Sequence, residues 1–260
     1  MNDQPLPGPA PAGEPAGLPS TIAAAWGLRD RPGKGPKRGL TLEQIVSAGL
    51  AVANADGLAA VSMSRVAAEL GVGTMSLYRY VESKRELLEL MLDAALGPAP
   101  LAEPQATWRQ GLSDWAWSAL AGYRHNLWVV QVPLAGPPAY PNALGWLERA
   151  LSCMRATRLD ESQKMSVILL LSNYVRAQAT MEAQIDAAVR AAGLSGGEAM
   201  AGYGQLLRAL LDAQRFPELS AIAEAGVMDK SDPWEDEFRF GLDRILDGVD
   251  VLVQNIASQD

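Results

Sequence analysis

Apolar residues within positions 63–88 have the spacing of two short helices joined by a tight turn. In the first part of this stretch they recur at steps of three and four residues, which places them on one face of a helix. That helix must end at Gly71, because Gly71 and Gly73 tolerate positive φ and permit a sharp reversal of the chain. A second helix is expected over residues 74–80. This is the spacing of a helix-turn-helix.

Capping residues mark where the neighbouring helices begin. A Thr-x-x-Gln capping box at Thr41 predicts a helix that ends near Ala55, and Ser62 is placed to cap the first helix of the pair. A Ser-x-x-Glu box at Ser83 starts a further helix that is expected to reach about Leu96. Together with the helix over residues 74–80 these make four, a three-helix helix-turn-helix unit and the helix after Ser83 that closes it.

The glycine and prolines of residues 97–100 interrupt the chain and mark a domain boundary. We divide the chain into an N-terminal extension (1–38), a helix-turn-helix domain (39–97) and a second domain (98–260). Beyond the boundary no strand alternation occurs, so the predicted fold class is all-α. Further helices are expected near residues 108–119 and 144–154, from Asp160 to about Ala191, from Ser195 to about Ala213, from Pro217 to Ala225, and after Asp232-Pro233.

Two of these helices carry long apolar stripes. In the last one the stripe alternates steps of four and three residues, a seam long enough to seek a partner helix in a dimer. More commonly, such an apolar stripe packs inside its own domain. The candidate dimer residues are Phe238, Leu242, Ile245, Val249 and Leu252, and the stripe expected on the helix after Asp160 is Met165, Ile168, Leu169, Val175 and Ala179.

The composition is that of an ordinary globular protein, with 48% hydrophobic and 20% charged residues among 260. Cys153 is the only cysteine and His125 the only histidine. An intrachain disulfide, a zinc cluster of cysteines and a conventional Cys-His or Ser-His-Asp nucleophile are therefore excluded. We expect no enzymatic activity, no metal and no cofactor. No apolar run is long enough to cross a bilayer and no signal core is present, which favours the cytoplasm.

Charge is distributed unevenly along the chain, whose formal net charge is -8. Residues 29–38 hold five basic side chains and one acidic one, whereas residues 39–97 hold four basic and seven acidic ones. The segment 29–38 is either a solvated linker or an arm that settles on DNA phosphates or in the minor groove. Residues 1–21 are rich in Pro, Gly and Ala and are expected to be disordered.

Three short motifs lie in the helix-turn-helix domain: a Leu-Gly-Val turn at residues 70–72, the aromatic-rich segment Leu77-Tyr78-Arg79-Tyr80-Val81, and the pair Ser83-Lys84. Together they resemble the TetR family of transcriptional repressors over about residues 40–96. Residues 112–181 more loosely resemble the ligand-binding half of the tetracycline-repressor-like subgroup. The resemblance implies a homodimer in which the last helix and the long one before it form a four-helix interface. Two half-sites about 34 to 36 Å apart then require an inverted-repeat operator in double-stranded DNA.

We expect the helix-turn-helix to contact DNA through side chains on and around its second helix. Arg79 could grip guanine O6 and N7 with two hydrogen bonds, and Met75 could touch a thymine methyl. Tyr78, Tyr80 and Lys84 are better placed for phosphates, although a core aromatic is the alternative for Tyr78. The candidate DNA-binding residues are Arg38, Thr41, Ser62, Ser64, Arg65, Thr74, Met75, Ser76, Tyr78, Arg79, Tyr80 and Lys84; for Ser64 and Arg65 an ordinary polar helix face fits equally well.

The second half of the chain is rich in Trp and Met, which suit a pocket for a bulky apolar ligand. Each of these side chains could instead belong to the core. Polar residues midway along the long helix are placed to orient a ligand, and for His125 a capping or surface role is the alternative. The candidate ligand-binding residues are Trp115, His125, Trp128, Trp146, Asn173, Arg176, Gln178 and Met181.

The resulting hypothesis is a homodimeric DNA-binding repressor that a small apolar or amphiphilic ligand releases from a palindromic operator. Two other classes remain open at this point. One is a constitutive DNA-binding protein without an effector. The other is a small-molecule-binding protein whose DNA-binding half is vestigial, which the acidic balance of residues 39–97 favours.

Overall fold

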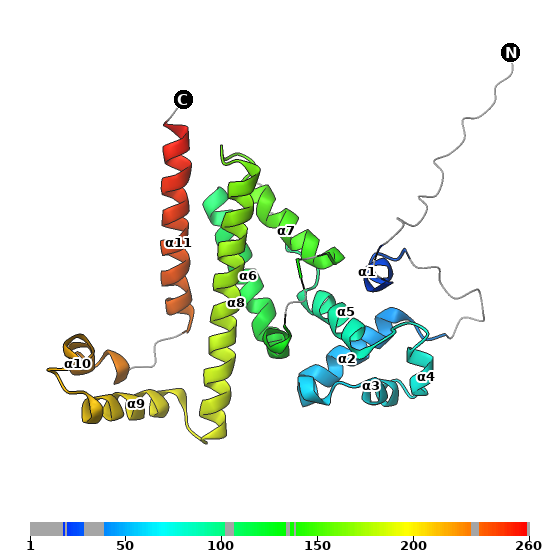
Figure 1. Ribbon diagram of the computed structural model, residues 1–260, viewed down its shortest axis with the longest axis horizontal. Helices are drawn as coiled ribbons and strands as arrows, with labels where there is room; N and C mark the ends of the chain where they lie inside the picture. Colours follow the sequence, from blue (N-terminus) through cyan, green and yellow to red (C-terminus); the bar gives the residue numbers. More distant parts are fainter. Residues whose placement is uncertain are drawn as a thin grey trace, which may run out of the picture. The chain divides into compact units, whose positions relative to one another are not determined.

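The computed structural model describes Leu18 and residues 20–28, 39–101, 107–133, 136–137, 139–229 and 234–258. Every regular element in these ranges is a helix, as the sequence predicts (Figure 1). The basic segment 29–38, with Arg38, and the predicted cap Asp232-Pro233 lie outside the described residues. The α-helices are α1 (Ser20–Ala25), α2 (Leu42–Asp56), α3 (Met63–Glu69), α4 (Thr74–Leu77), α5 (Lys84–Leu96), α6 (Trp108–His125), α7 (Pro141–Cys153), α8 (Glu161–Ala191), α9 (Gly196–Leu210), α10 (Pro217–Glu224) and α11 (Trp234–Ala257), and the 3-10 helices are η1 (Leu58–Ala60), η2 (Leu127–Gln131) and η3 (Val227–Asp229).

The chain forms two compact units. Residues 1–98 and 134–145 make up the first, and residues 99–133 and 146–260 make up the second. The sequence predicts a single boundary at residues 97–100, whereas the structure also groups the segment 134–145 with the helix-turn-helix. The division therefore falls within α7 as well, between Gly145 and Trp146.

Helices of the first unit begin at the predicted caps. Thr41 Oγ1 accepts a hydrogen bond from the Gln44 amide, and the Gln44 side chain accepts one from the Thr41 amide, which confirms the capping box. α2 ends at a glycine, because Gly57 takes a φ of 83°. Ser62 Oγ accepts from the Arg65 amide at 3.1 Å and starts α3.

The turn after α3 needs only one of its two glycines for the reversal. Gly71 has a φ of 66°, which residues with a Cβ adopt at a cost, whereas Gly73 has an ordinary φ of -73°. The prediction of a helix over residues 74–80 is wrong at its end. α4 stops at Leu77, and the chain continues as a turn through Tyr80.

α5 begins at Ser83, whose Oγ accepts a hydrogen bond from the Glu86 amide at 3.1 Å. The Glu86 carboxylate is buried and accepts from the amide of Glu82, one residue before the cap. The helices of the first unit hold an apolar core. Its fully buried members include Ile45, Val52, Val66, Leu77, Leu87 and Met91.

α6, α8 and α11 surround the core of the second unit (Figure 1). Asp160 and Gln163 form the predicted capping box at the start of α8. The stripe predicted on this helix is partly wrong, because Met165 and Leu169 are 45% and 63% exposed. No helix in the described ranges is both long and apolar enough to cross a membrane. The buried side chains of α8 are Val167, Ile168, Leu171, Val175, Gln178, Ala179 and Glu182.

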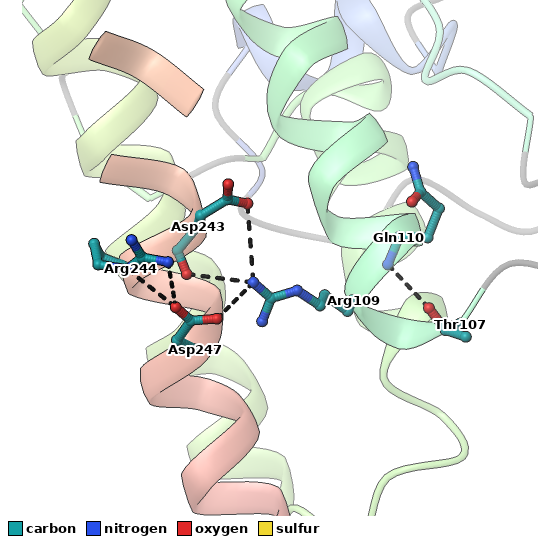
Figure 2. A network of polar contacts seen from close by, with 6 residues as sticks. All are labelled: Thr107, Arg109, Gln110, Asp243, Arg244 and Asp247. Carbon is teal, nitrogen blue, oxygen red and sulfur yellow. Dashed lines mark hydrogen bonds and ion pairs between the residues drawn. The ribbon is translucent and has the colours of Figure 1, made fainter. Parts of the chain in front are cut away.

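A polar network joins the first turn of α6 to the middle of α11 (Figure 2). Arg109 Nη2 donates to Asp247 Oδ1 at 2.7 Å and lies 3.8 Å from Asp243 Oδ1. Arg244 donates to the other oxygen of the Asp247 carboxylate at 2.6 Å. Hydrogen bonds from Arg244 and then from Arg109 hold the pKa of Asp247 below its usual value.

Most of the predicted dimer seam on α11 packs inside its own unit. Phe238 is fully buried, with its ring stacked on Tyr174 at a centroid distance of 5.3 Å and edge-on to Trp117 at 4.6 Å. Leu242 and Val249 are buried as well. These three seam residues are therefore unavailable to a second chain, since their surface is already covered. The seam residues that stay half-exposed are Ile245 and Leu252.

Candidate nucleic-acid interface and ligand region

One buried side chain anchors α4, and the others turn outward. Leu77 is fully buried, whereas Met75 is 77% exposed and Tyr78 44% exposed. Arg79 is exposed as well. The alternative of Tyr78 as a core aromatic is not supported, because nearly half of its side chain faces solvent. The half-buried members of the set predicted here are Thr74, Ser76 and Tyr80.

Arg65 lies in a cluster of ion pairs on α3. Its Nη1 donates to Glu69 Oε2 at 2.7 Å and its Nη2 to Asp56 Oδ2 at 3.1 Å. The bond to Glu69 and then the bond to Asp56 raise the pKa of the guanidinium. Any contact of Arg65 with DNA would have to compete with these two carboxylates. The predicted hydroxyl contacts are likewise engaged, Thr41 and Ser62 as helix caps and Ser64 with Ser62 at 3.1 Å.

Much of the acidity of the first unit is neutralised or bound inside it. By contrast, Arg79 and Lys84 are exposed and form no ion pair with any residue of the described ranges. The acids that have partners include Asp56 and Glu69 (with Arg65), Glu89 (with Arg85 and Tyr140), Asp93 (with the first amides of α7) and Glu86 (with the Glu82 amide). None of these carboxylates is paired with Arg79 or Lys84.

The tryptophans predicted to line a ligand pocket lie in the core of the second unit. Trp115, Trp128 and Trp146 are 6%, 3% and 7% exposed. Trp115 Nε1 donates to the Trp146 carbonyl at 3.0 Å, and the two rings meet edge to face at 6.1 Å. His125 is exposed in the last turn of α6 and does not join them. Trp115 and Trp146 are therefore in direct contact within the core.

The polar candidates on α8 separate into two faces. Asn173, Arg176 and Met181 border a shallow depression along the helix, which Gln184 also lines. Arg176 Nη2 donates to the carbonyl of Val132 at 2.8 Å and so ties the end of η2 to α8. Gln178 is buried on another side of the helix and does not reach the depression.

A buried polar cluster in the second unit escaped the sequence analysis. Glu182 is 4% exposed, and Arg124 of α6 grips its carboxylate with two hydrogen bonds of 2.7 and 3.0 Å. Arg124 also donates to Glu235 of α11 at 2.6 Å, and Gln178 donates to Glu182 at 3.1 Å. Glu182, more than Glu235, raises the pKa of Arg124. The signal was present, since Gln178 and Glu182 continue the steps of four and three set by the buried residues of α8.

Two family models match the chain in the order of its units. The model described as "Bacterial regulatory proteins, tetR family" matches residues 45–91, from α2 into α5. The model described as "Tetracyclin repressor-like, C-terminal domain" matches residues 99–253, which hold α6 to most of α11.

Individual proteins agree with this assignment. The HTH-type transcriptional repressor DrrR1 of Streptomyces coeruleorubidus is 39% identical over 235 residues, which cover 90% of this chain and 86% of that repressor. The TetR family protein ActR of Streptomyces coelicolor in complex with (S)-DNPA has a TM-score of 0.66 and 28% identity, covering 81% of this chain and 97% of ActR. Apo ActR has a TM-score of 0.69 and 27% identity, covering 81% and 95%. The chain therefore belongs to the TetR family and is a DNA-binding transcriptional repressor, not an enzyme.

Proposed function

We propose that this repressor acts in the cytoplasm as a homodimer on an inverted-repeat operator, and that a small apolar or amphiphilic molecule releases it. One observation carries the DNA contact: Met75, Tyr78 and Arg79 are exposed around α4, which the buried Leu77 anchors. A second helix presented in this way can enter the major groove, where an arginine pairs with guanine. Lys84, at the start of α5, is suited to a phosphate.

The distribution of charge supports DNA binding over a vestigial DNA-binding half. Counted along the sequence, residues 39–97 are acidic, but Asp56, Glu69, Glu89 and Asp93 all have partners within the first unit. Each arginine paired with these carboxylates, Arg65 and Arg85, cancels one negative charge in the summed field, whereas a hydrogen bond from an amide or a hydroxyl leaves the charge in place. Arg79 and Lys84 are the charges left to meet the phosphate backbone.

Exposed apolar side chains on α8 and α11 support the dimer. Leu170 is 50% exposed and borders a groove between the two helices together with Ile245 and Leu252. Covering such side chains contributes about 25 cal/mol for each Å² of apolar surface removed from water. Two copies joined here would form the four-helix interface of the family and would hold two α4 helices at the spacing of operator half-sites, about 34 to 36 Å.

The ligand response is proposed from the likeness of the second unit to ActR, of which solved structures contain (S)-DNPA and actinorhodin. These two molecules are therefore the first probes to test on this chain. Asn173, Arg176 and Met181 remain the residues we propose for contact with a ligand. A ligand that prefers a conformer with the wrong separation of the two α4 helices lowers operator affinity by that preference, tenfold for roughly 1.4 kcal/mol.

Fluorescence anisotropy tests the DNA contact, with the full-length protein on labelled DNA from upstream of its own gene and with scrambled competitor. Arg79→Ala should weaken specific binding about 5- to 150-fold and relax the choice of one base pair in each half-site. Arg155→Ala is the matched control, because Arg155 is exposed in the turn after α7 and its loss changes the net charge equally. Equal losses in the two variants would show that Arg79 does not read the operator.

Adding (S)-DNPA or actinorhodin to the same protein–DNA complex distinguishes a ligand-controlled repressor from the two alternative functions. Release of the DNA supports a ligand-controlled repressor. Specific DNA binding that neither probe changes favours a constitutive regulator, and binding of a probe without specific DNA affinity favours a small-molecule-binding protein. A salt series identifies specific binding, since log affinity falls linearly with log salt as counterions are released.

A further inference from the structure

The first turn of α7 is fastened to α5 by hydrogen bonds that neither the DNA contact nor the ligand contact uses. Asp93 of α5 accepts from the amides of Asn142 and Ala143, at 3.2 Å through Oδ2 and 2.9 Å through Oδ1. The Asn142 side chain donates back to the Asp93 carbonyl at 3.0 Å. Because the first amides of a helix have no partner inside it, Asp93 acts as the cap of α7 from a different helix.

A tyrosine adds a second tie between the same two segments. Tyr140, directly before α7, donates its hydroxyl hydrogen to Glu89 Oε2 at 2.7 Å. The other oxygen of Glu89 accepts from Arg85 Nε at 2.9 Å, which fixes the carboxylate. Burial, followed by the hydrogen bond to Glu89, raises the pKa of the Tyr140 hydroxyl, so the tyrosine keeps the proton that it donates.

A third contact to the segment before α7 comes from the N-terminal extension, and we call it the strap. α1 packs against α5, and Trp26 directly after α1 donates its indole Nε1–H to the Ala139 carbonyl at 2.9 Å. The two residues are 113 positions apart in the sequence. Neither family model reaches α1, since the matches cover residues 45–91 and 99–253. The strap is thus a feature of this chain that the family matches do not account for.

We call these ties among Trp26, Glu89, Asp93, Tyr140 and Asn142 the α7 joint. On its core side, α5 buries side chains such as Leu87 and Met91 among the helices of the DNA-binding unit. α7 runs on without interruption to Cys153, past the residue where the first unit ends. The joint therefore lies where one continuous helix leaves the DNA-binding unit.

We propose that Asp93 and Trp26 are positioning residues, which fix the first turn of α7 on α5 so that a change in α7 reaches α4. The proposal rests on the proposed function in one respect, namely that a ligand is what produces the change. Neither residue touches DNA or ligand in this scheme. Both act through α5, which packs on α2. In turn α2 packs on α3, and α3 packs on α4, which the buried Leu77 anchors.

Hydrogen–deuterium exchange of the full-length protein tests the joint without ligand or DNA. In Asp93→Ala, loss of the cap should speed exchange of the amides at residues 139–145 about tenfold, and exchange at α4 should rise by a smaller factor. Asp93→Asn keeps one acceptor oxygen, which can accept from one of the two amides, so it should restore slow exchange at both places only in part. Trp26→Phe keeps an aromatic ring but removes the N–H, and it should act like Asp93→Ala at both places, only more weakly.

Asp160→Ala is the matched control, because Asp160 caps α8 within the second unit. It should speed exchange in the first turn of α8 and leave α4 unchanged. The proposal is overturned if Asp93→Ala speeds amide exchange at residues 139–145 alone, while α4 exchanges as slowly as in the wild type. It is also overturned if Trp26→Phe changes the exchange rate neither at residues 139–145 nor at α4. If Asp93→Ala exchanges fast throughout because it fails to fold, Trp26→Phe decides by the same criteria.

Operator binding with actinorhodin as the probe gives the functional readout. We expect the factor by which actinorhodin weakens DNA binding to fall at least about fivefold in Asp93→Ala, while the affinity of the free protein for actinorhodin stays unchanged. If actinorhodin weakens DNA binding by the same factor in Asp93→Ala as in the wild type, the proposal for the α7 joint is overturned. A wild type that binds no upstream DNA, or that actinorhodin does not release, speaks against the proposed function alone, because the exchange measurement then decides on the joint.

Discussion

The two units differ in how completely they bury their own large apolar side chains. In the first unit the exposed ones are confined to the N-terminal segment and α4, and they are Leu18, Trp26, Leu28, Met75 and Tyr78. In the second unit they occur on four helices. They include Met165, Leu169 and Leu170 on α8, Tyr203, Leu206 and Leu210 on α9, Leu219 and Ile222 on α10, and Phe240 and Val251 on α11.

This difference separates two kinds of exposed apolar residue. Single exposed side chains beside a closed core, such as Met75, cost little and suit a surface that reads another molecule. Contiguous exposed stripes mark a surface that another chain covers. The described part of the first unit leaves fewer such side chains exposed, and we expect those of the second unit to be covered by a second copy.

The largest effect is expected where a charge is placed in the exposed stripe of the second unit. Leu170→Asp would bring two carboxylates into the proposed interface, near Ile245 and Leu252. We expect the dimer to dissociate at micromolar concentration, as measured by analytical ultracentrifugation. Operator affinity should fall by about a hundredfold or more, because a single dimer no longer binds both half-sites at once.

Ala156→Asp controls for the added charge, since Ala156 is exposed in the turn after α7 and outside the groove. It should leave both the mass of the dimer in analytical ultracentrifugation and the operator affinity unchanged. A dimer that survives Leu170→Asp would mean that the exposed stripe of the second unit has another occupant, and the contrast between the units would then need a different explanation.

A pair of glycine substitutions compares how tightly the two units are packed. A Cβ on Gly49 in α2 would meet Met91 Sδ at 2.6 Å, at the flexible end of a side chain that can move away. A Cβ on Gly241 in α11 would meet the ring of Tyr174, with Cζ at 2.7 Å. That ring cannot yield easily, because it is stacked on Phe238 and its hydroxyl donates to the Phe238 carbonyl at 3.0 Å.

We therefore expect Gly241→Ala to lower the free energy of unfolding by about 1–3 kcal/mol, the usual cost of overpacking. Gly49→Ala should change it by less than about 1 kcal/mol, because the gain in helix propensity offsets the local crowding. Urea denaturation followed by circular dichroism measures both. A larger loss for Gly49→Ala than for Gly241→Ala would reverse the comparison.

The helix-turn-helix of the first unit was predictable almost residue by residue, because its signals act over three or four positions. In contrast, α1 (Ser20–Ala25) was not predicted, and the expectation of disorder over residues 1–21 is wrong at its end. Thr41, Ser62 and Ser83 each cap the helix that the sequence assigned to them, and Gly71 makes the reversal. The early end of α4 at Leu77 was not predictable, since a single turn of helix and the turn that follows it share the same spacing of apolar residues.

In the second unit the pattern predicted helices but not which face of each is buried. Met165 and Leu169 are as apolar as Val167 and Leu171, and the steps between them fit a helix equally well. The choice is made by packing against distant helices, which no local signal contains. The spacing of Gln178 and Glu182 places both on the buried face of α8, but no local signal identifies Arg124, 58 residues away, as the partner of Glu182.

The smallest expected effect concerns the surface network of the second unit in Figure 2, which has no counterpart of this kind at α4. Hydrogen bonds from Arg244 and Arg109 lower the pKa of Asp247, so the folded chain takes up this proton less readily than the unfolded chain. The stabilisation by Asp247 is therefore present above its ordinary pKa of 3.8 and is lost as pH falls through the lower folded value. We expect Asp247→Asn to melt slightly below the wild type at pH 7, and the difference in Tm to shrink as the solution is acidified below that range. Asp186→Asn, at an exposed position of α8 without an ion pair in the described ranges, should show no such trend. A difference that grows on acidification would mean that Asp247 is protonated more easily in the folded chain, opposite to the effect of two neighbouring guanidinium groups.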